Sequence, residues 1–463
     1  MNYFIKSTVH CLFICMFSLS PCYAQIIFNT PNDAVQFAIQ NSETLKLDAI
    51  NAQLALQNAK YAITDFLPSL SFSFSESDTI EQHAADVRSK SLDVSLTQFL
   101  YDGGKRTLSY KMAKSESLLA YKSYLSNLQS FTANIFSLYY DCICAHKAVS
   151  IQEQVAACAL EQLTIIKSEQ ALGLALQTDY LEYQIQVMQL QNELAQSQRT
   201  ERTCLRKLKA ALGLDIQFDI TLGDVSFDSI EEPLYENHIN TLYSFALKNN
   251  VSVQKQQYAL LYGKKQLEQS HNYFLPDVNL VGSMSFTGTT YPLTQPSYQL
   301  KLSFSFSRNP FTPLSVSNGA TFTDKRMSSM SNNAQTSVNP QIDFMVKQAK
   351  SKTAMLQTYQ SFEQQQTELY EGVFSSVSSH DDCVSTLHVL EDTIHLEELK
   401  LTVSEREMAA GEIKRIDYLK VLIELAQQKV QLLQTQCKLS SSTRELEILI
   451  GIPIGGIRNV IMQ

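Results

Sequence analysis

Residues 66–75 read FLPSLSFSFS, in which a proline is followed by a strict alternation of serine with Leu or Phe. Because a period of two is typical of a β-strand and proline ends a helix, this stretch predicts a helix that stops near Pro68 and leads directly into a strand. The same tripeptide returns as Phe274-Leu275-Pro276, and the correspondence at a spacing of 208 residues extends from Asn32 to about Leu100. The chain therefore carries one unit twice. Such a duplication is typical of a tubular protein, whereas a catalytic pocket seldom needs two near-equivalent copies of one unit.

The second halves of the two copies correspond at a spacing of 238 residues, so that Asp179-Tyr180-Leu181 returns as Asp417-Tyr418-Leu419. The later copy therefore contains about 30 additional residues, and it carries a Ser-, Thr- and Asn-rich insert at about 311–340. The boundaries that follow are a signal peptide at 1–24, a first structural repeat at 25–213, a linker at 214–240, a second structural repeat at 241–451 and a tail at 452–463.

The first residues predict export. Lys6 precedes an apolar segment, Cys11 to Leu19, that is too short to span a bilayer, and a small-residue cleavage site follows it at Cys22-Tyr23-Ala24. The same region resembles a lipobox, in which case Cys22 would be lipidated. No other stretch approaches 18 consecutive apolar residues, so any membrane span of the mature chain must consist of strands.

The composition excludes one class of partner and favours helices. Hydrophobic residues make up 44% of the 463 residues and charged residues only 18%, which is enough apolar material for a large core. The net charge of −9, with no basic stripe, argues against nucleic acid as a partner.

Four long helices are predicted from the absence of helix breakers. No Pro occurs between Pro68 and Pro233 or between Pro340 and Pro453. Within these spans the Gly-free segments are 105–172, 174–212, 373–410 and 412–450. They predict two helical hairpins with exposed tips near 173–179 and 411–417. Alternating steps of three and four between apolar residues from Leu118 to Cys142 are typical of a coiled coil.

Four strands are predicted, at about 69–80, 91–100, 277–287 and 297–307. We expect one face of these strands to contact lipid, through Leu70, Phe72, Phe74, Leu302, Phe304 and Phe306. Open sheet edges are not tolerated in a bilayer and four strands are too few to close a barrel, so several chains must share one. The alternative is a soluble sandwich whose Phe and Leu side chains face a core.

In their order and duplication these elements resemble the TolC family of outer-membrane efflux proteins. The resemblance rests on the Phe-Leu-Pro helix ends, the strand-to-helix junction Leu100-Tyr101-Asp102-Gly103-Gly104 and the glycine-containing turn at 173–179. It implies a mainly α protein with a transmembrane β-barrel portion, in which a homotrimer forms a twelve-stranded barrel in the outer membrane. The implied helical tunnel extends into the periplasm and closes at its tips, where a periplasmic adaptor docks and connects the channel to an inner-membrane pump.

The resemblance also assigns roles to the tips. The implied adaptor-docking residues are Gly173, Leu174, Ala175, Gly411, Glu412 and Ile413. Family members often carry two acidic residues three apart at the closed aperture. Asp179 and Glu182 keep this pair in the first repeat, whereas Asp417 is followed by Lys420 in the second, which weakens or redistributes a cation-attracting ring. An ordinary helix N-cap is the alternative role for Asp417.

Six cysteines remain after removal of the signal peptide, in a compartment that favours oxidation. Cys383 and Cys437 lie 28 and 26 residues from Gly411, which predicts that they face each other across the second hairpin and form a disulfide. The same count places Cys204 opposite Cys142 or Cys144 in the first hairpin, and leaves Cys158 as a free thiol. The alternative is that all are free cysteines buried in an apolar seam.

The sequence contains no nucleophile elbow, phosphate-binding loop or dinucleotide fingerprint, so we expect no enzyme and no cofactor. The densest metal-like group, from His380 to His395, is typical of a solvated coiled-coil face, and no metal is expected. The predicted function is a passive exit duct of a tripartite efflux or type I secretion system, for small molecules or polypeptide. The alternative is a periplasmic coiled-coil adaptor or scaffold that does not span the membrane.

Overall fold

The computed structural model describes residues 26–79, 87–215, 217–223, 238–271, 274–306, 313–323, 326–336 and 342–457. The predicted signal peptide with Cys22, most of the linker at 214–240 and the end of the tail lie outside these ranges. Within them, no helix combines the length and the apolar character of a membrane-spanning helix.

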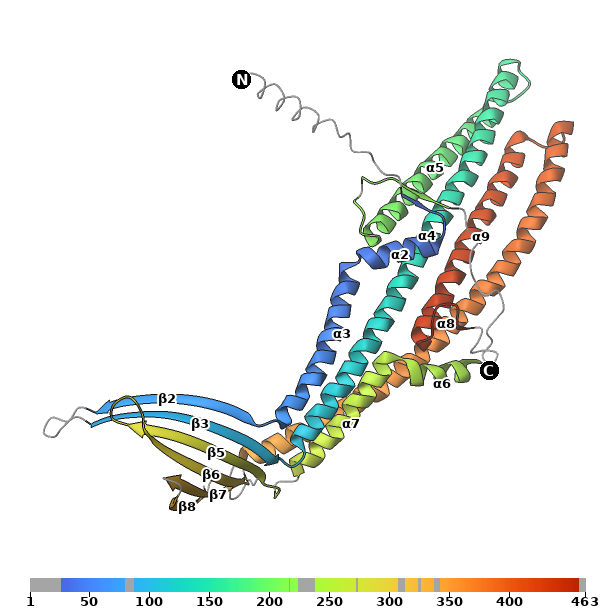
Figure 1. Cartoon of the computed structure of the whole chain (residues 1–463). Helices are drawn as coiled ribbons and strands as arrows, with labels where there is room; N and C mark the ends of the chain where they lie inside the picture. The colour runs from blue at the N-terminus through green and yellow to red at the C-terminus, as the bar shows by residue number, and fades with distance from the viewer. Residues whose placement is uncertain are drawn as a thin grey trace, which may run out of the picture. The chain divides into compact units, whose positions relative to one another are not determined.

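Both repeats follow the same order of elements, with two short helices, a strand hairpin and a long helical hairpin (Figure 1). The first repeat contains α2 (Pro31–Asn41), α3 (Glu43–Tyr61), η1 (Ala62–Phe66), β2 (Ser69–Thr79), β3 (Val87–Tyr101), α4 (Lys105–Ala171) and α5 (Gln177–Ala211). The second contains α6 (Ile239–Asn249), α7 (Val251–His271), β5 (Asp277–Gly288), β6 (Gln295–Ser305), β7 (Leu314–Thr323), β8 (Arg326–Thr336), α8 (Ile342–Ala410) and α9 (Arg415–Ile450). The duplication of long helical hairpins predicted from the sequence is therefore confirmed.

The chain folds into two compact units, and each unit draws on both repeats. The helical unit consists of Met1–Lys46, Ser126–Ala246 and Tyr370–Gln463, and the sheet unit consists of Leu47–Leu125 and Leu247–Leu369. In the helical unit, a short parallel pair of strands, β1 (Ile26–Phe28) and β4 (Ile220–Leu222), is fixed to α4 by Tyr139. The Tyr139 hydroxyl is fully buried and donates a hydrogen bond of 3.0 Å to the Phe28 carbonyl, so this aromatic side chain anchors the pair.

In the sheet unit, contacts between the repeats join α4 to α7. The Ser115 and Tyr262 hydroxyls lie 2.6 Å apart, and Lys122 donates to the Gln254 side chain at 2.8 Å. These polar contacts fix the helices from which β5 starts and into which β3 leads.

The sheet has six antiparallel strands, in the order β2-β3-β5-β6-β7-β8, where the sequence predicted four. The four predicted strands are present within a few residues of their expected bounds. The two additional strands, β7 and β8, come from the insert at about 311–340. Its Ser-, Thr- and Asn-rich sequence hid the alternation, because Asn318 interrupts the apolar face that Leu314, Val316, Ala320 and Phe322 mark in β7.

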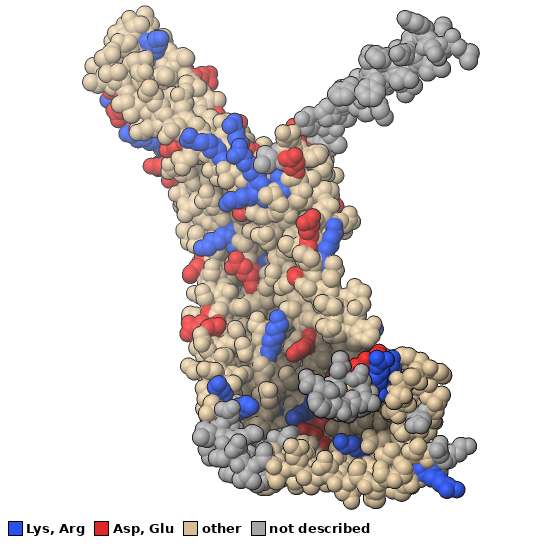
Figure 2. Space-filling model, turned by 90° about the vertical axis from the view of Figure 1, so that its left-hand side faces the viewer, with Lys and Arg blue, Asp and Glu red and all other residues tan. Residues whose placement is uncertain are grey.

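The pairing register places most apolar side chains of the six strands on one face, and Phe99 and Val281 lie on the other. One row across the sheet holds Phe72, Val94, Met284, Tyr298, Phe322 and Met327. The neighbouring row on the opposite face holds Ser71, Ser95, Ser283, Gln299, Thr321 and Ser329. In Figure 2 the surface of the sheet is mostly tan, whereas charged side chains are dispersed over the helices. The sheet therefore has one apolar and one polar, largely uncharged face.

Candidate channel aperture and strand-to-helix junction

The two hairpin tips have the same backbone design. Gly173 and Gly411 adopt φ angles of 77° and 79°, a left-handed conformation that favours glycine, and an added Cβ at either would meet nothing within 4 Å. The next residue closes each turn, since the Leu174 N–H donates to the Glu169 carbonyl at 2.8 Å and the Glu412 N–H to the Glu407 carbonyl at 2.9 Å. The glycines are thus required for the turns and not for packing.

The residues predicted to dock an adaptor all lie in these two turns. Gly173, Leu174, Gly411 and Glu412 are exposed, and Ala175 and Ile413 are half-buried. The first tip also exposes leucines on both sides of the turn, with Leu172, Leu174 and Leu176 retaining 75%, 77% and 65% of their surface. Three exposed leucines at one turn form an apolar patch, which none of the sequence patterns indicated.

Beneath the tips, the two hairpins share one core. Ala159 of α4, Tyr183 of α5 and Leu419 of α9 are 0–1% exposed and belong to one apolar cluster. Burial raises the pKa of the Tyr183 hydroxyl, whose oxygen has no hydrogen-bond partner among the described residues. The cluster holds α9 against the first hairpin directly below the turns.

Arg415, the first residue of α9, joins the second hairpin to the first. Its guanidinium donates to Glu169 at 2.8 and 3.4 Å and to the Gln162 side chain at 2.6 Å. Two hydrogen bonds to one carboxylate fix the orientation as well as the distance. No local sequence pattern indicates the role of Arg415, because its partners on α4 lie 246 and 253 residues away.

The predicted aperture residues take part in a second set of ion pairs. Asp179 accepts a hydrogen bond of 3.3 Å from Lys414, so an acid of the first repeat contacts a base of the second. Asp417 lies 3.6 Å from Lys420 of its own helix, and Glu182 is exposed. Their location at the narrowest point of a channel stays a prediction.

The alternative role of Asp417 as an N-cap is wrong. The N-cap of α9 is Lys414, which makes no side-chain cap, and Asp417 is the third residue of the helix. Asp179 occupies the same place in α5, whose N-cap is Leu176. Both acids therefore interact favourably with a helix N-terminus from within the first turn.

Neither predicted disulfide is present, and the six cysteines in the described part of the chain are free. Cys383 packs against Leu439, which lies two residues beyond Cys437 and therefore points to a different side of α9. The Cys437 thiol instead contacts Asp141 of α4 at 3.1 Å, and the Cys144 thiol donates to the Leu433 carbonyl at 3.3 Å. Cys142 and Cys204 lie in the same apolar cluster as Cys437. Burial raises the pKa of Cys142, so this thiol is poorly reactive.

The metal-like group on α8 is only partly a solvated face. His380 is fully buried and its Nδ1 lies 3.2 Å from Asp381, and Cys383 is also buried. His388 is exposed, 3.9 Å from Glu391. Across the described part of the chain, no group of three or more His, Cys, Asp or Glu side chains could hold a metal ion.

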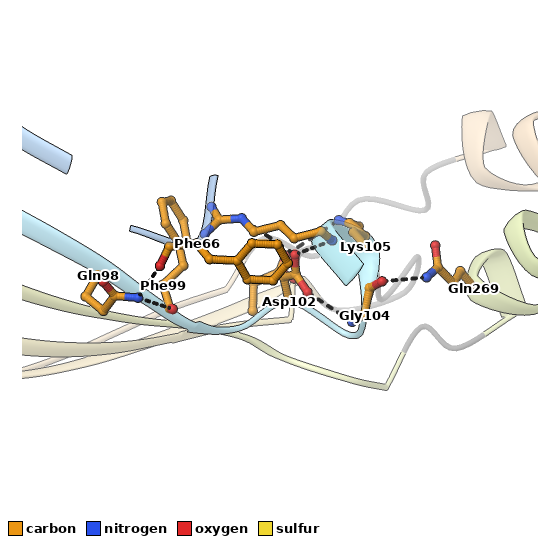
Figure 3. A network of polar contacts seen from close by, with 9 residues as sticks. Phe66, Gln98, Phe99, Asp102, Gly104, Lys105 and Gln269 are labelled. Carbon is orange, nitrogen blue, oxygen red and sulfur yellow. Dashed lines mark hydrogen bonds and ion pairs between the residues drawn. The ribbon is translucent and has the colours of Figure 1, made fainter. Parts of the chain in front are cut away.

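The strand-to-helix junction at 100–104 is built by Asp102 (Figure 3). Its carboxylate accepts from the Gly104 N–H at 3.0 Å and the Arg106 N–H at 2.8 Å, which caps the first turn of α4. Gly103 and Gly104 have φ angles of 67° and 85°, so they make the sharp change of direction from β3 to α4.

The same junction ties three other segments together. The Gly104 carbonyl accepts from Gln269 of α7 at 3.1 Å, and Lys105 lies 3.9 Å from Asp277 at the start of β5. On β3, Gln98 donates to the Phe66 carbonyl at 3.1 Å, next to the Phe-Leu-Pro segment (Figure 3). Helix ends and strand starts of both repeats therefore meet at a single polar network.

Residues 34–214 match the family model described as outer membrane efflux protein. No curated protein matches the chain in sequence.

Solved structures match both repeats. The CmeC outer membrane channel of Campylobacter jejuni superposes with a TM-score of 0.73 at 12% identity, covering 93% of this chain and 89% of that chain. The outer membrane protein VceC of Vibrio cholerae gives a TM-score of 0.73 at 12% identity, with 91% and 96% covered. The open-state MtrE channel of Neisseria gonorrhoeae gives 0.67 at 11% identity, with 92% and 89% covered. Residues 34–214 thus match the outer membrane efflux protein family model, and the chain has the fold of these outer-membrane channels over both repeats.

Proposed function

We propose that three copies of the chain form the outer-membrane exit duct of a tripartite efflux or type I secretion system. A periplasmic adaptor docks on the hairpin tips, and an inner-membrane pump supplies the energy. The observation that carries the proposal is the combination, in one chain, of a two-faced sheet and helical hairpins joined by ion pairs near exposed tips.

The sheet supports a position in the lipid. Leu70, Phe72 and Phe74 of β2 share the apolar face and keep 57%, 69% and 56% of their surface exposed, a large cost in water. Leu302 and Phe304 of β6 lie on the same face, and Phe306 directly follows β6, its N–H bonded to the Leu314 carbonyl at 2.7 Å.

Ion pairs end the apolar band on β2. Beyond Phe74, on the same face, the pairs Glu76 with Lys90 at 2.6 Å and Asp78 with Arg88 at 3.8 Å replace the apolar side chains. A limited apolar band bordered by charged residues is typical of a strand that crosses a bilayer into a polar interface.

The tips support docking and gating. The leucine patch at 172–176 suits an apolar ridge of an adaptor, and the Arg415 and Lys414 contacts hold the second hairpin to the first. An adaptor that binds the tips and breaks these few contacts would open the duct, because the contacts are partly exposed and individually weak.

Gene deletion with complementation tests the function. We expect the deletion strain to accumulate a fluorescent efflux substrate such as ethidium, or to lose a secreted polypeptide, and the wild-type chain to restore the loss from the outer-membrane fraction. Leu174→Asp should form the oligomer but fail to restore transport, whereas Leu399→Asp, an exposed leucine of α8 at 52%, should restore it. A deletion that changes neither transport process, or a chain recovered as a soluble monomer, would overturn the proposal.

A further inference from the structure

We infer that β8 of one copy pairs with β2 of the next, so that three copies close a barrel of eighteen strands and not the twelve that four strands per chain would give. This inference rests on the proposed trimer. The partner is a second copy of this chain, and the interface is a strand-to-strand contact at the two edges of the sheet.

The two edges are open in a single chain. β2 and β8 are the outer strands of the six, each has 11 residues, and every residue of both is exposed. A bilayer offers no hydrogen-bond partner to the free backbone groups of such an edge, so both edges must find a strand.

The direction of the strands permits this pairing. Successive strands across the sheet are antiparallel, and their number is even, so β8 runs opposite to β2. A copy of β2 placed beside β8 continues the antiparallel ladder, as barrel closure requires.

The hairpin of β7 and β8 lies between β6 and α8 in the chain, so it forms the connection from the sheet to the helical hairpin. β6 does not lead into α8; the chain passes through β7 and β8 first, and α8 begins at Ile342 after β8 ends at Thr336. β8 therefore occupies the place next to the helical connection that β6 would occupy in a four-stranded sheet.

The faces match across the proposed contact. Met330 and Met327 of β8 lie in the rows of Leu70 and Phe72, on the apolar face, and are 67% and 54% exposed. On the opposite face, β8 presents Ser329, Ser331 and Asn333, and β2 presents its own serines. Pairing would continue both the apolar and the polar face around the barrel.

A twelve-stranded barrel would require β2 of the next copy to pair with β6. The ladder from Ser297 with Thr323 to Ser305 with Ser315 would then be lost. The displaced hairpin would carry Val316 and Phe322 out of the apolar face, which is unfavourable because these apolar side chains would be exposed to water. Barrel diameter grows roughly linearly with strand number, so eighteen strands give a barrel about half as wide again as twelve.

Cysteine cross-linking in outer membranes tests the pairing. All described native cysteines lie on helices, so they are first replaced by alanine or serine without touching the sheet. Ser71→Cys is then combined in turn with Ser329→Cys, Ser331→Cys or Asn333→Cys, three polar-face positions that scan the register. Copper phenanthroline oxidises each thiol pair to a disulfide, with molecular oxygen as the final electron acceptor.

We expect one or two of these pairs to give covalent dimers and trimers on a non-reducing gel. Ser71→Cys with Ser95→Cys, whose native hydroxyls lie 2.6 Å apart within one chain, should give only an internal bond. Ser71→Cys with Ser303→Cys, on β6, should give no oligomer. Oligomers from the β6 pair, or none from any β8 pair in a protein that still forms heat-modifiable trimers, would overturn the inference. Absence of any outer-membrane trimer would instead overturn the proposed function.

Discussion

Arg415→Ala tests whether the contacts between the hairpins keep the duct closed. The substitution removes two hydrogen bonds to Glu169, of 2.8 and 3.4 Å, and one to Gln162, of 2.6 Å. The Arg415 and Glu169 side chains are 28% and 32% exposed, so solvent screens the pair and we assign about 1 kcal/mol to it. If three copies open together, the loss is about 3 kcal/mol, which shifts the equilibrium towards the open state by about two orders of magnitude.

Single-channel recording in planar bilayers measures this shift as the fraction of time in the high-conductance state. The matched control is Lys429→Ala, which breaks a pair of 2.7 Å with Glu398 but connects two helices of the same hairpin. We expect Arg415→Ala to raise the open fraction strongly, Glu169→Gln to raise it less, and Lys429→Ala to leave it unchanged. An open fraction for Arg415→Ala within about twofold of the wild type would refute the gating role.

Three further outcomes are expected. Phe72→Arg, on the apolar face, should destabilise the barrel by about 2–4 kcal/mol and reduce the heat-stable oligomer on a gel, whereas Ser73→Arg on the polar face should not. Equal losses from the two substitutions would contradict our assignment of the faces. Burial raises the pKa of Glu447, so the folded chain binds its proton more tightly than the unfolded chain, and stability should fall as pH rises from the ordinary carboxyl range through the raised pKa. Glu447→Gln should remove this slope from thermal unfolding curves, and an unchanged slope would show that another group causes it. Cys383 and Cys437 should both be alkylated in unfolded protein without reductant, and protection of both would restore the predicted disulfide.

The long helices and four of the strands could be predicted because local chemistry sets their limits. Gly173 and Gly411 adopt a backbone conformation that other residues avoid, and Pro68 and Pro276 separate helix from strand. The alternation in FLPSLSFSFS is visible because Phe and Leu contrast strongly with Ser. In β8 one face carries Met, Asn and Ala and the other carries Ser and Asn. Because the two faces differ little in polarity, the sequence pattern did not indicate a strand there.

Contacts between the hairpins could not be predicted, because no local sequence pattern indicates them. Counting residues from Gly411 gives the height of Cys437 on its helix correctly but not the side of the helix on which it lies. That side faces Asp141 of the first hairpin. The contacts of Arg415 could not be predicted for the same reason. Its partners belong to the other repeat, and only the packing of α9 against α4 brings them together.

Electron cryomicroscopy of the oligomer extracted from outer membranes tests the account most directly. The account predicts a threefold assembly in which the sheets close one barrel, with β8 of each copy beside β2 of the next and the hairpin tips of the three copies converging. A monomer, or an assembly in which the edges of the sheet remain unpaired, would contradict it.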